Sequence, residues 1–338
     1  MSAAALQRRN QLRGIASETR SLLPTILSQL DSWNTTASSL HHKRTLTQLD
    51  PKDCPGYRLP EDDPEAGTRG TRIRVYDQDT FDAALDLQPG FTFSSLSPPM
   101  NKSAPTSVTQ SEDSTLDPAA IATQTTEPST SKNPMIPKPV AILNLASERH
   151  PGGGWLNGAL AQEEALCFRS SLSVTLHEHY YPIPALGAIY SPLVLLIREA
   201  MSRGHGLIWP DTPAQNLPVT AVITMAALRR PELTRDGTYR YAQDKDMMKN
   251  KIRVILRVAV HQGHSKLVLG ALGCGAFGNP PREVAQCFLE VFQEHEFQGG
   301  WWEDVVFAIL DNARKEQGGK DGVGNFGFFY RALDGTLV

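Results

Sequence analysis

The sequence has no surplus of charge of either sign. Its 338 residues include 33 Lys and Arg against 36 Asp and Glu, which gives a formal net charge of -3 at pH 7. A protein that binds nucleic acid through a basic surface or tail carries a marked excess of cations. The composition therefore argues against a direct nucleic-acid partner, although it leaves room for a local pocket that binds an anion.

Paired cysteines and long apolar runs are also missing. The four cysteines, Cys54, Cys167, Cys274 and Cys287, form no Cys-x-x-Cys pair, which argues against a disulfide scaffold and a structural zinc site. No apolar run reaches the ~18–20 residues that span a bilayer, and the first residues lack the apolar core of a signal peptide. We therefore expect a soluble protein of a reducing compartment, without a membrane partner. A Ser/Thr- and Pro-rich insertion, such as the one in this chain, is commoner in eukaryotic proteins and favours the nucleus or cytoplasm.

Aliphatic residues become scarce between residues 88 and 138. This stretch is rich in Ser, Thr and Pro, and such a composition buries too little apolar surface to offset the entropy lost on ordering. We predict a disordered insertion at 88–138. Residues 1–70 are predicted to form an N-terminal extension of helix and loop, and residues 71–338 one domain that carries the insertion.

The rest of the chain alternates between strand and helix patterns. Residues 5–30 carry the apolar stripe of an amphipathic helix, which Pro24 should kink or end, and residues 31–70 are predicted to be loop. Strands are predicted at 72–76, 139–146, 217–228, 264–272 and 304–311, with one or two more within 187–199. Helices are predicted at 80–87, from 162 onward, at 241–263 and at 280–295. This order indicates an α/β fold with a largely parallel central sheet.

A glycine-rich loop follows the strand predicted at 264–272. Residues 273–278 match the pattern G-x-G-x-x-G, and Asn279 and Pro280 suit the N-cap and the first position of the next helix. Exposed amides and a helix N-terminus together bind anions, so we predict a diphosphate-binding loop. The alternative is a tight turn that needs glycine only for positive φ. The late position, and the lack of an acid about 20 residues further on, argue against a dinucleotide-binding oxidoreductase.

An earlier glycine-rich loop precedes two adjacent acids. Residues 152–154 are three glycines, and seven residues separate them from Gln162, Glu163 and Glu164 at a predicted helix start. Three glycines allow the backbone to pack against a ligand where a Cβ would clash. Neighbouring helical residues point about 100° apart, so the two acids would serve different purposes. The alternative is that both acids only complement the helix dipole.

The spacing GGG-x7-QEE, in 152-GGGWLNGALAQEE-164, resembles the signature of poly(ADP-ribose) glycohydrolases of the bacterial and fungal type. The similarity covers most of the chain outside 31–70 and 88–138. It implies a macrodomain-like three-layer α/β/α sandwich with a mixed central sheet. It also implies hydrolysis of the ribose–ribose O-glycosidic bonds of poly(ADP-ribose), releasing ADP-ribose, from chain ends if the N-terminal helix covers the far end of the cleft.

The resemblance assigns roles residue by residue. It implies Glu164 as the catalytic acid and base and Glu163 as the group that holds hydroxyls of the scissile ribose. Cleavage of a glycosidic bond does need an acid for the leaving oxygen, because it passes through an oxocarbenium-like state. The implied substrate-binding residues are Asn144, Ser147, Gly152, Gly153, Gly154, Gln162, Gly273, Cys274, Gly275, Ala276, Phe277, Gly278 and Asn279.

Further residues are candidates for other chemistry. The histidine pairs 177/179 and 261/264 lack a third ligand, so we expect no metal, and we expect no cofactor. Cys274 lacks a paired base for nucleophilic catalysis. Residues 229–230, two arginines, favour a solvated turn over a phosphate clamp, whereas the tyrosines at 180–181 could rim a nucleotide cleft.

Two other functions stay open. The chain could hydrolyse ADP-ribose attached to protein or to a small conjugate, or it could be a non-enzymatic ADP-ribose reader. Glu163 and Glu164 argue against the reader, because a reader needs no acid in its cleft. We expect a monomer whose partners are poly(ADP-ribose), ADP-ribose and the proteins that carry the polymer.

Overall fold

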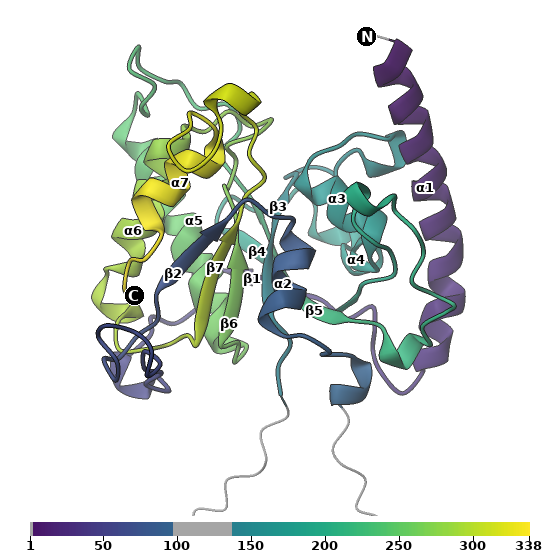
Figure 1. Ribbon diagram of the computed structural model, residues 1–338, viewed down its shortest axis with the longest axis horizontal. Coiled ribbons are helices and arrows are strands. Elements are labelled where there is room, and N and C mark those ends of the chain that lie inside the picture. The colour runs from purple at the N-terminus through teal and green to yellow at the C-terminus, as the bar shows by residue number, and fades with distance from the viewer. Residues whose placement is uncertain (1–2, 97–136) are drawn as a thin grey trace, which may run out of the picture.

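A seven-stranded sheet lies between two layers of helices (Figure 1). The structure, a computed structural model, describes residues 3–96 and 137–338. The strands are β1 (Ser39–His42), β2 (Ile73–Tyr76), β3 (Ala141–Ala146), β4 (Gly187–Leu195), β5 (Val219–Ala226), β6 (Lys266–Leu269) and β7 (Asp304–Ala308). The α-helices are α1 (Ala3–Leu27), α2 (Thr80–Leu87), α3 (Gln162–Arg169), α4 (Leu172–Thr175), α5 (Ala242–His261), α6 (Pro281–Phe292) and α7 (Asn325–Leu333). The predicted α/β sandwich with a mixed sheet is confirmed.

The strand order explains where a ligand site can form. The sheet runs β1-β4-β5-β3-β6-β7-β2, with β5, β3, β6, β7 and β2 mutually parallel and β4 antiparallel to both β5 and β1. Strands covered on both faces are continuously apolar, and all eight residues of β5 are buried. Because β5, β3 and β6 are neighbours and run parallel, their carboxyl ends lie at one edge of the sheet, which is where open α/β sheets bind ligands.

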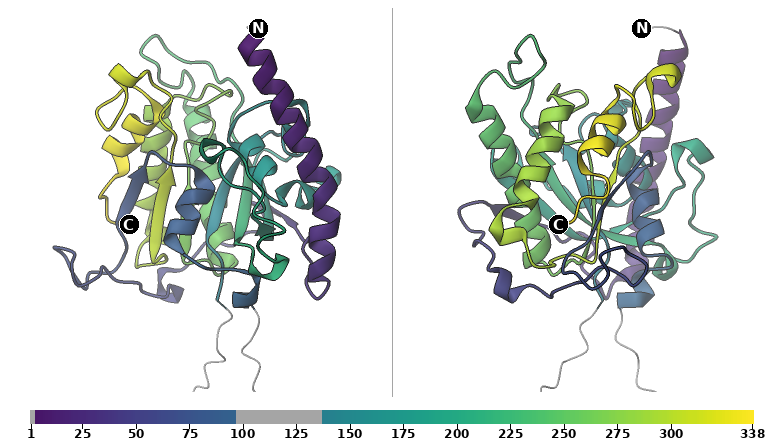
Figure 2. Two further views of the ribbon diagram at one scale, coloured as in Figure 1. Left: turned by 45° about the vertical axis from the view of Figure 1, so that its right-hand side comes forward. Right: turned by 60° about the vertical axis from the view of Figure 1, so that its left-hand side comes forward.

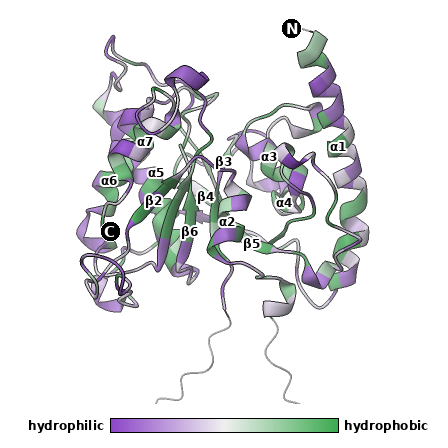
Figure 3. Cartoon of the chain, in the orientation of Figure 1, coloured by the Kyte–Doolittle hydropathy of each residue, from purple (hydrophilic) through white to green (hydrophobic). Residues whose placement is uncertain are grey.

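Alternate strand residues feed two apolar cores. Ala141 and Leu143 of β3 pack with residues of α5, α6 and α7, whereas Ile142 packs on the other face with residues of α1, α2 and α3. Figure 2 shows α1 along the outside of this second layer, away from α6 and α7. Hydrophobic colour follows the strands between the layers in Figure 3. In the described part of the chain, no helix is both long and apolar enough to cross a bilayer.

The N-terminal 70 residues differ from the expected loop and helix boundaries at two places. Helix α1 continues through Pro24 to Leu27, because Leu23 and Ile26 are buried and packing holds this last turn. Residues 39–42, predicted as loop, form the edge strand β1, which pairs with β4 from Ser39↔Tyr190 to His42↔Gly187. The strand is short and polar, as edge strands commonly are, so its sequence lacks the apolar alternation that predicts a strand.

The predicted insertion at 88–138 is too long at both ends. Phe91, Phe93 and Leu96 are buried in a third apolar cluster, and Gln88 accepts a hydrogen bond from the Val140 N–H at 3.0 Å. Residues 88–96 and 137–138 therefore belong to the fold, since the apolar side chains of Phe91, Phe93 and Leu96 supply the buried area that the composition of the stretch did not predict. The remainder of the predicted insertion, 97–136, lies outside the described residues.

Candidate active site

Helix α3 begins directly against the end of β3. The pairing of β3 with β6 covers only Ala141 and Ile142. Beyond it, the Gln162 amide accepts from the Leu145 N–H at 2.8 Å and donates to the Leu143 carbonyl at 2.7 Å. Its second N–H donates to Thr80 Oγ1 at 3.2 Å. Both amide hydrogens are thus used within the protein, so we interpret Gln162 as a residue that positions α3 and not as the predicted substrate contact.

Glu163 is a buried acid with a raised pKa. Its side chain is only 3% exposed, and Oε2 accepts the Ser147 N–H at 2.7 Å. Burial raises the pKa of Glu163 to about 8, the negative charge of Glu164 adds to this rise, and the Ser147 hydrogen bond opposes it. A protonated carboxyl can both donate to and accept from a hydroxyl.

Glu164 is the next residue in the same turn of α3. Its Oε1 accepts the Gly154 N–H at 2.9 Å, and its Oε2 accepts the N–H of Ala161, the N-cap of α3, at 3.0 Å. The second bond is half of a capping box. Glu164 therefore does serve the helix start, as the alternative interpretation expected, but it also ties the first glycine-rich loop to α3.

Gly153 brings the loop onto both acids. Its φ is +59°, a left-handed conformation that glycine adopts without strain. A Cβ at this position would lie 2.5 Å from Glu164 Oε1 and 3.0 Å from Glu163 Oε2. Both carboxyls thus face the same bare backbone, and only glycine leaves room for them there.

Two buried polar atoms beside Glu163 have no partner. The Asn144 amide donates to Thr224 Oγ1 at 3.2 Å, but among the described residues its Oδ1 and the Tyr181 hydroxyl accept or donate no hydrogen bond. Tyr181 is close enough for the charge of Glu163 to add to the pKa rise that burial causes in its hydroxyl. Buried polar atoms without partners are rare in folded proteins and call for a ligand or water.

Ser147 organises the turn between β3 and the first glycine-rich loop. Besides the N–H that binds Glu163, its Oγ accepts the N–H groups of Arg149 and His150 at 3.2 and 3.3 Å. This side chain therefore shapes the loop that carries the three glycines.

The side-chain amide of Asn279 fixes the second glycine-rich loop, residues 273–279, through three hydrogen bonds. The amide of Asn279 donates to the Leu228 carbonyl at 2.6 Å and to the Gly273 carbonyl at 3.1 Å, and it accepts from the Tyr239 hydroxyl at 2.9 Å. The prediction that Asn279 caps the next helix is wrong, because α6 has Pro280 at its N-cap and Pro281 at its first position. The buried amide is instead a clamp between this loop and the residues after β5.

The tip of this loop presents backbone donors. Gly275 and Ala276 are exposed, and within the described chain the N–H groups of Gly275, Ala276 and Phe277 have no acceptor. The Cys274 thiol, in contrast, is buried, and burial raises its pKa. The loop can therefore offer amide hydrogens to an anion, while its cysteine is an unreactive packing group.

Arg229 connects the two loops, although the sequence favoured a solvated turn. It follows β5, its guanidinium carbon lies 5.6 Å from the centre of the Phe277 ring, and it donates to Glu148 at 3.0 Å. Glu148 belongs to the loop after β3 and Phe277 to the loop after β6. The signal in the sequence was the position of Arg229 just beyond the carboxyl end of a buried strand.

Nowhere in residues 3–96 and 137–338 do three potential metal ligands come together.

Known proteins resemble this chain in sequence and fold. Residues 34–199 match the family "Microbial-type PARG, catalytic domain". The poly(ADP-ribose) glycohydrolase (PARG) of Thermomonospora curvata aligns with 96% of this chain and 99% of its own, at 25% identity and a TM-score of 0.61. The same protein bound to the inhibitor ADP-HPD aligns at 24% identity over 95% and 99% of the two chains, with a TM-score of 0.62.

A second solved protein supports the same assignment. The PARG of Deinococcus radiodurans in complex with ADP-ribose aligns at 25% identity over 88% of this chain and 95% of its own, with a TM-score of 0.54. No match was found among curated proteins. The matched family, the three-layer fold and the turn of α3 beneath three glycines agree, and together they support a microbial-type PARG.

Proposed function

We propose that this chain is a poly(ADP-ribose) glycohydrolase that hydrolyses ribose–ribose O-glycosidic bonds and releases ADP-ribose. The observation that carries the proposal is the pair Glu163 and Glu164, which face Gly153 at the same sheet edge as a loop with free amide donors. The match of residues 34–199 to the microbial-type PARG catalytic domain and the likeness to a PARG solved with ADP-ribose support it.

The two loops divide the binding of ADP-ribose between them. The distal ribose lies against Gly152, Gly153 and Gly154, where bare backbone allows close approach. Its hydroxyls reach Glu163 and the unpartnered Oδ1 of Asn144. The diphosphate lies on the free amides of 275–277, in the way that glycine-rich turns hold phosphates. Binding through backbone donors explains how a polyanion can be bound by a chain with a net charge of -3.

Glu164 acts as the general acid and base. It protonates the leaving oxygen of the neighbouring ribose as the bond from that oxygen to C1 of the distal ribose breaks. Its carboxylate then takes a proton from the water that attacks C1, so the acid returns to its starting state. Near neutral pH the Glu163–Glu164 pair holds one proton, because burial and the neighbouring charge of Glu164 raise the pKa of Glu163. The mechanism requires that this shared proton lies on Glu164 when the leaving oxygen is protonated. The bound diphosphate shields the positive charge that develops on the ribose.

Helix α1 bears on which bonds are cut. Arg9 and Arg13 each donate from Nε to the Asn157 carbonyl, at 2.8 and 3.2 Å, so α1 packs beside the first glycine-rich loop. A wall at this place favours a chain end over an internal unit of the polymer. We therefore propose cleavage from chain ends, and proteins that carry poly(ADP-ribose) as partners.

One assay separates the candidate functions. The protein is incubated with automodified polymer and with mono-ADP-ribosylated protein, and free ADP-ribose is measured. Release from polymer only supports the glycohydrolase, and release from the mono-modified protein would support the alternative hydrolase. Binding without release from either substrate would support a reader.

The Glu164→Gln variant tests the assignment of the acid. Loss of a general acid lowers the rate by about 100- to 10,000-fold, and we expect ADP-ribose affinity to stay within a few-fold. Near wild-type hydrolysis by this variant would overturn the role of Glu164. The Glu163→Gln variant is the matched control, and it should weaken substrate binding more than the Glu164 variant does.

A further inference from the structure

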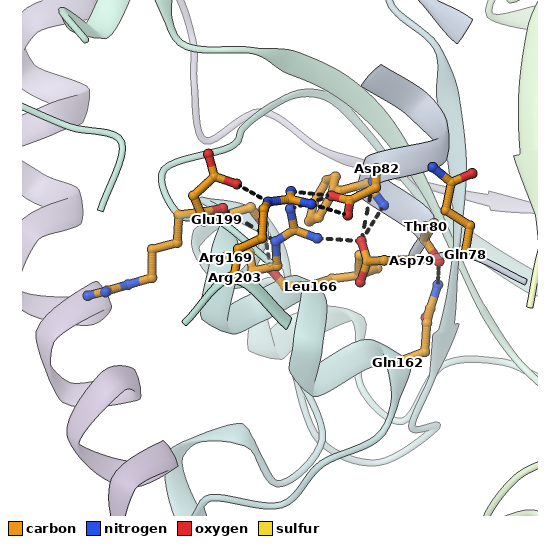
Figure 4. A network of polar contacts seen from close by, with 12 residues as sticks. Gln78, Asp79, Thr80, Asp82, Gln162, Leu166, Arg169, Glu199 and Arg203 are labelled. Carbon is orange, nitrogen blue, oxygen red and sulfur yellow. Dashed lines mark hydrogen bonds and ion pairs between the residues drawn. The ribbon is translucent and has the colours of Figure 1, made fainter. Parts of the chain in front are cut away.

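A buried cluster of charges joins the start of α2 to the end of α3 (Figure 4). Arg169, in the last turn of α3, is 1% exposed. Its guanidinium donates to Asp79 Oδ1, to Asp82 Oδ1 at 2.9 Å and to the Arg198 carbonyl at 3.3 Å. A buried guanidinium with this many acceptors is held in one orientation, because its fork of donors is planar and rigid.

The same turn of α2 also binds the start of α3. Thr80 is the first residue of α2, and its Oγ1 accepts the Gln162 amide N–H at 3.2 Å (Figure 4). Asp79, which is the N-cap of α2, accepts the Phe81 N–H at 2.9 Å and binds Arg169 as well. One helical turn therefore contacts the first and the last residue of α3, and the acids at 163 and 164 lie between these two contacts.

Helix α3 depends on such contacts for its orientation. It has eight residues, and isolated helices of that length are unstable in water. Its direction must therefore be fixed by the elements packed around it. A tilt of α3 would move the carboxyls away from Gly153, and a misplacement of ~1 Å in a catalytic site can cost on the order of 100-fold in rate.

We infer that Arg169 and Asp79 are positioning residues for hydrolysis, which hold the Glu163–Glu164 turn against the first glycine-rich loop by fixing α2 to α3. This inference rests on the proposed function. The outer side of the same cluster provides a control. Arg203 binds Asp82 at 2.9 Å and Glu199 at 2.6 Å (Figure 4), but it is half exposed, and among the described residues it makes no hydrogen bond or ion pair with α3.

The test compares three single variants. Arg169→Lys keeps the charge but loses the fork, and Asp79→Asn keeps a capping residue but loses the charge. We expect each to lower kcat by about 10- to 100-fold, as misplaced acids would, while KM changes by less than about 3-fold. Arg203→Gln should leave kcat within about 2-fold of wild type, since exposed ion pairs contribute little.

A second readout does not depend on activity. The pH midpoint for titration of the Glu163 carboxyl is followed by carbon-13 NMR in the wild-type protein and in the three variants. Besides Glu164 and Cys167 of α3, Glu163 faces the Tyr181 hydroxyl and the Ser147 N–H. Water that enters around a displaced turn should lower the midpoint by one unit or more in the Arg169 and Asp79 variants and leave it unchanged in the Arg203 variant.

Several results would overturn the inference. One is a loss of thermal stability in Arg169→Lys and Asp79→Asn with kcat and the Glu163 midpoint both unchanged. Another is an equal loss of kcat in Arg203→Gln. If the wild-type protein released no ADP-ribose from polymer, the proposed function would fail, and the Glu163 midpoint would still decide whether Arg169 and Asp79 position this turn.

Discussion

The loop after β3 and the loop after β6 lie at the same sheet edge, and each contains four glycines, but glycine has a different role in each loop. In the first loop Gly153 makes room for the side chains of two acids. In the second loop Gly273 makes room for packing, because a Cβ there would clash with the Ala227 and Asn279 side chains. The tip beyond it exposes backbone amides.

This difference separates chemistry from binding. The first loop surrounds the titratable groups of the site, so a change there should alter the rate of the reaction. The second loop contributes backbone donors and no titratable group except the buried thiol of Cys274. A change there should alter ligand affinity and the free energy of unfolding more than it alters kcat. Glycine-rich motifs are therefore understood only when the atoms around each glycine are known.

The largest effect is expected from Gly153→Ala. The new Cβ would lie 2.5 Å from Glu164 Oε1 and must displace the acid, and a shift of ~1 Å can lower kcat on the order of 100-fold. Steady-state release of ADP-ribose from polymer measures this. The control is Gly204→Ala, which has a similar left-handed φ of +87° but no atom within 4 Å, and which should keep wild-type kcat. Equal losses in both variants would show that backbone strain alone is responsible.

Gly273→Ala should show the opposite pattern. Its φ is +74° and its Cβ would meet packed side chains, so we expect the free energy of unfolding to fall by about 1–3 kcal/mol, as in overpacked cores. Displacement of the loop should also weaken ADP-ribose binding by about 10-fold, which is about 1.4 kcal/mol. Urea denaturation and calorimetric titration measure the two effects. A variant with normal affinity but a 100-fold lower kcat would break the comparison between the loops.

The first loop should contribute to the pH dependence of stability through Glu163. The pKa of Glu163 rises from an ordinary 4.5 to about 8 on folding, so the folded protein binds this proton more tightly than the unfolded chain. The contribution to stability is complete below about pH 4.5 and is lost as the pH rises through about 8. Glu163→Gln should remove this contribution from the thermal unfolding midpoint measured between pH 5 and 8.5, while Gly273→Ala should keep the wild-type pH dependence of that midpoint. A Glu163→Gln profile parallel to that of wild type would contradict the assignment.

The smallest effect is expected from Arg229→Gln, at the junction of the loops. Arg229 is half exposed and binds Glu148 and the Phe277 ring, and exposed ion pairs contribute about 0–1 kcal/mol. We expect ADP-ribose affinity to fall by no more than about 5-fold, which follows from that energy, with kcat unchanged. Calorimetric titration at low and high salt measures the change. A loss above 100-fold would mean that Arg229 binds the diphosphate directly.

Local patterns predicted the elements that carry the site. The structure confirms a buried strand at β3, the start of α3 at Gln162 and loops at the two glycine-rich stretches. These features could be predicted because apolar periodicity and turn residues act over short stretches of chain. Strand β1 was missed because its pairing with β4 depends on backbone hydrogen bonds and not on apolar side chains. The insertion was predicted too long because Phe91 and Phe93 are buried against residues that are distant in sequence and come together only in the folded chain.

The charge balance, the absence of long apolar runs, the alternation of strands and helices and the spacing of three glycines from Gln162, Glu163 and Glu164 were all determined by the sequence itself. The tertiary structure alone decided which polar groups stay free for a ligand. It occupied the amides of Gln162 and Asn279 and left Oδ1 of Asn144 unpartnered. It also joined Arg169 to Asp79, 90 residues apart. The reason is physical: hydrogen bonds and burial depend on neighbours that the fold brings together, and no local pattern records them.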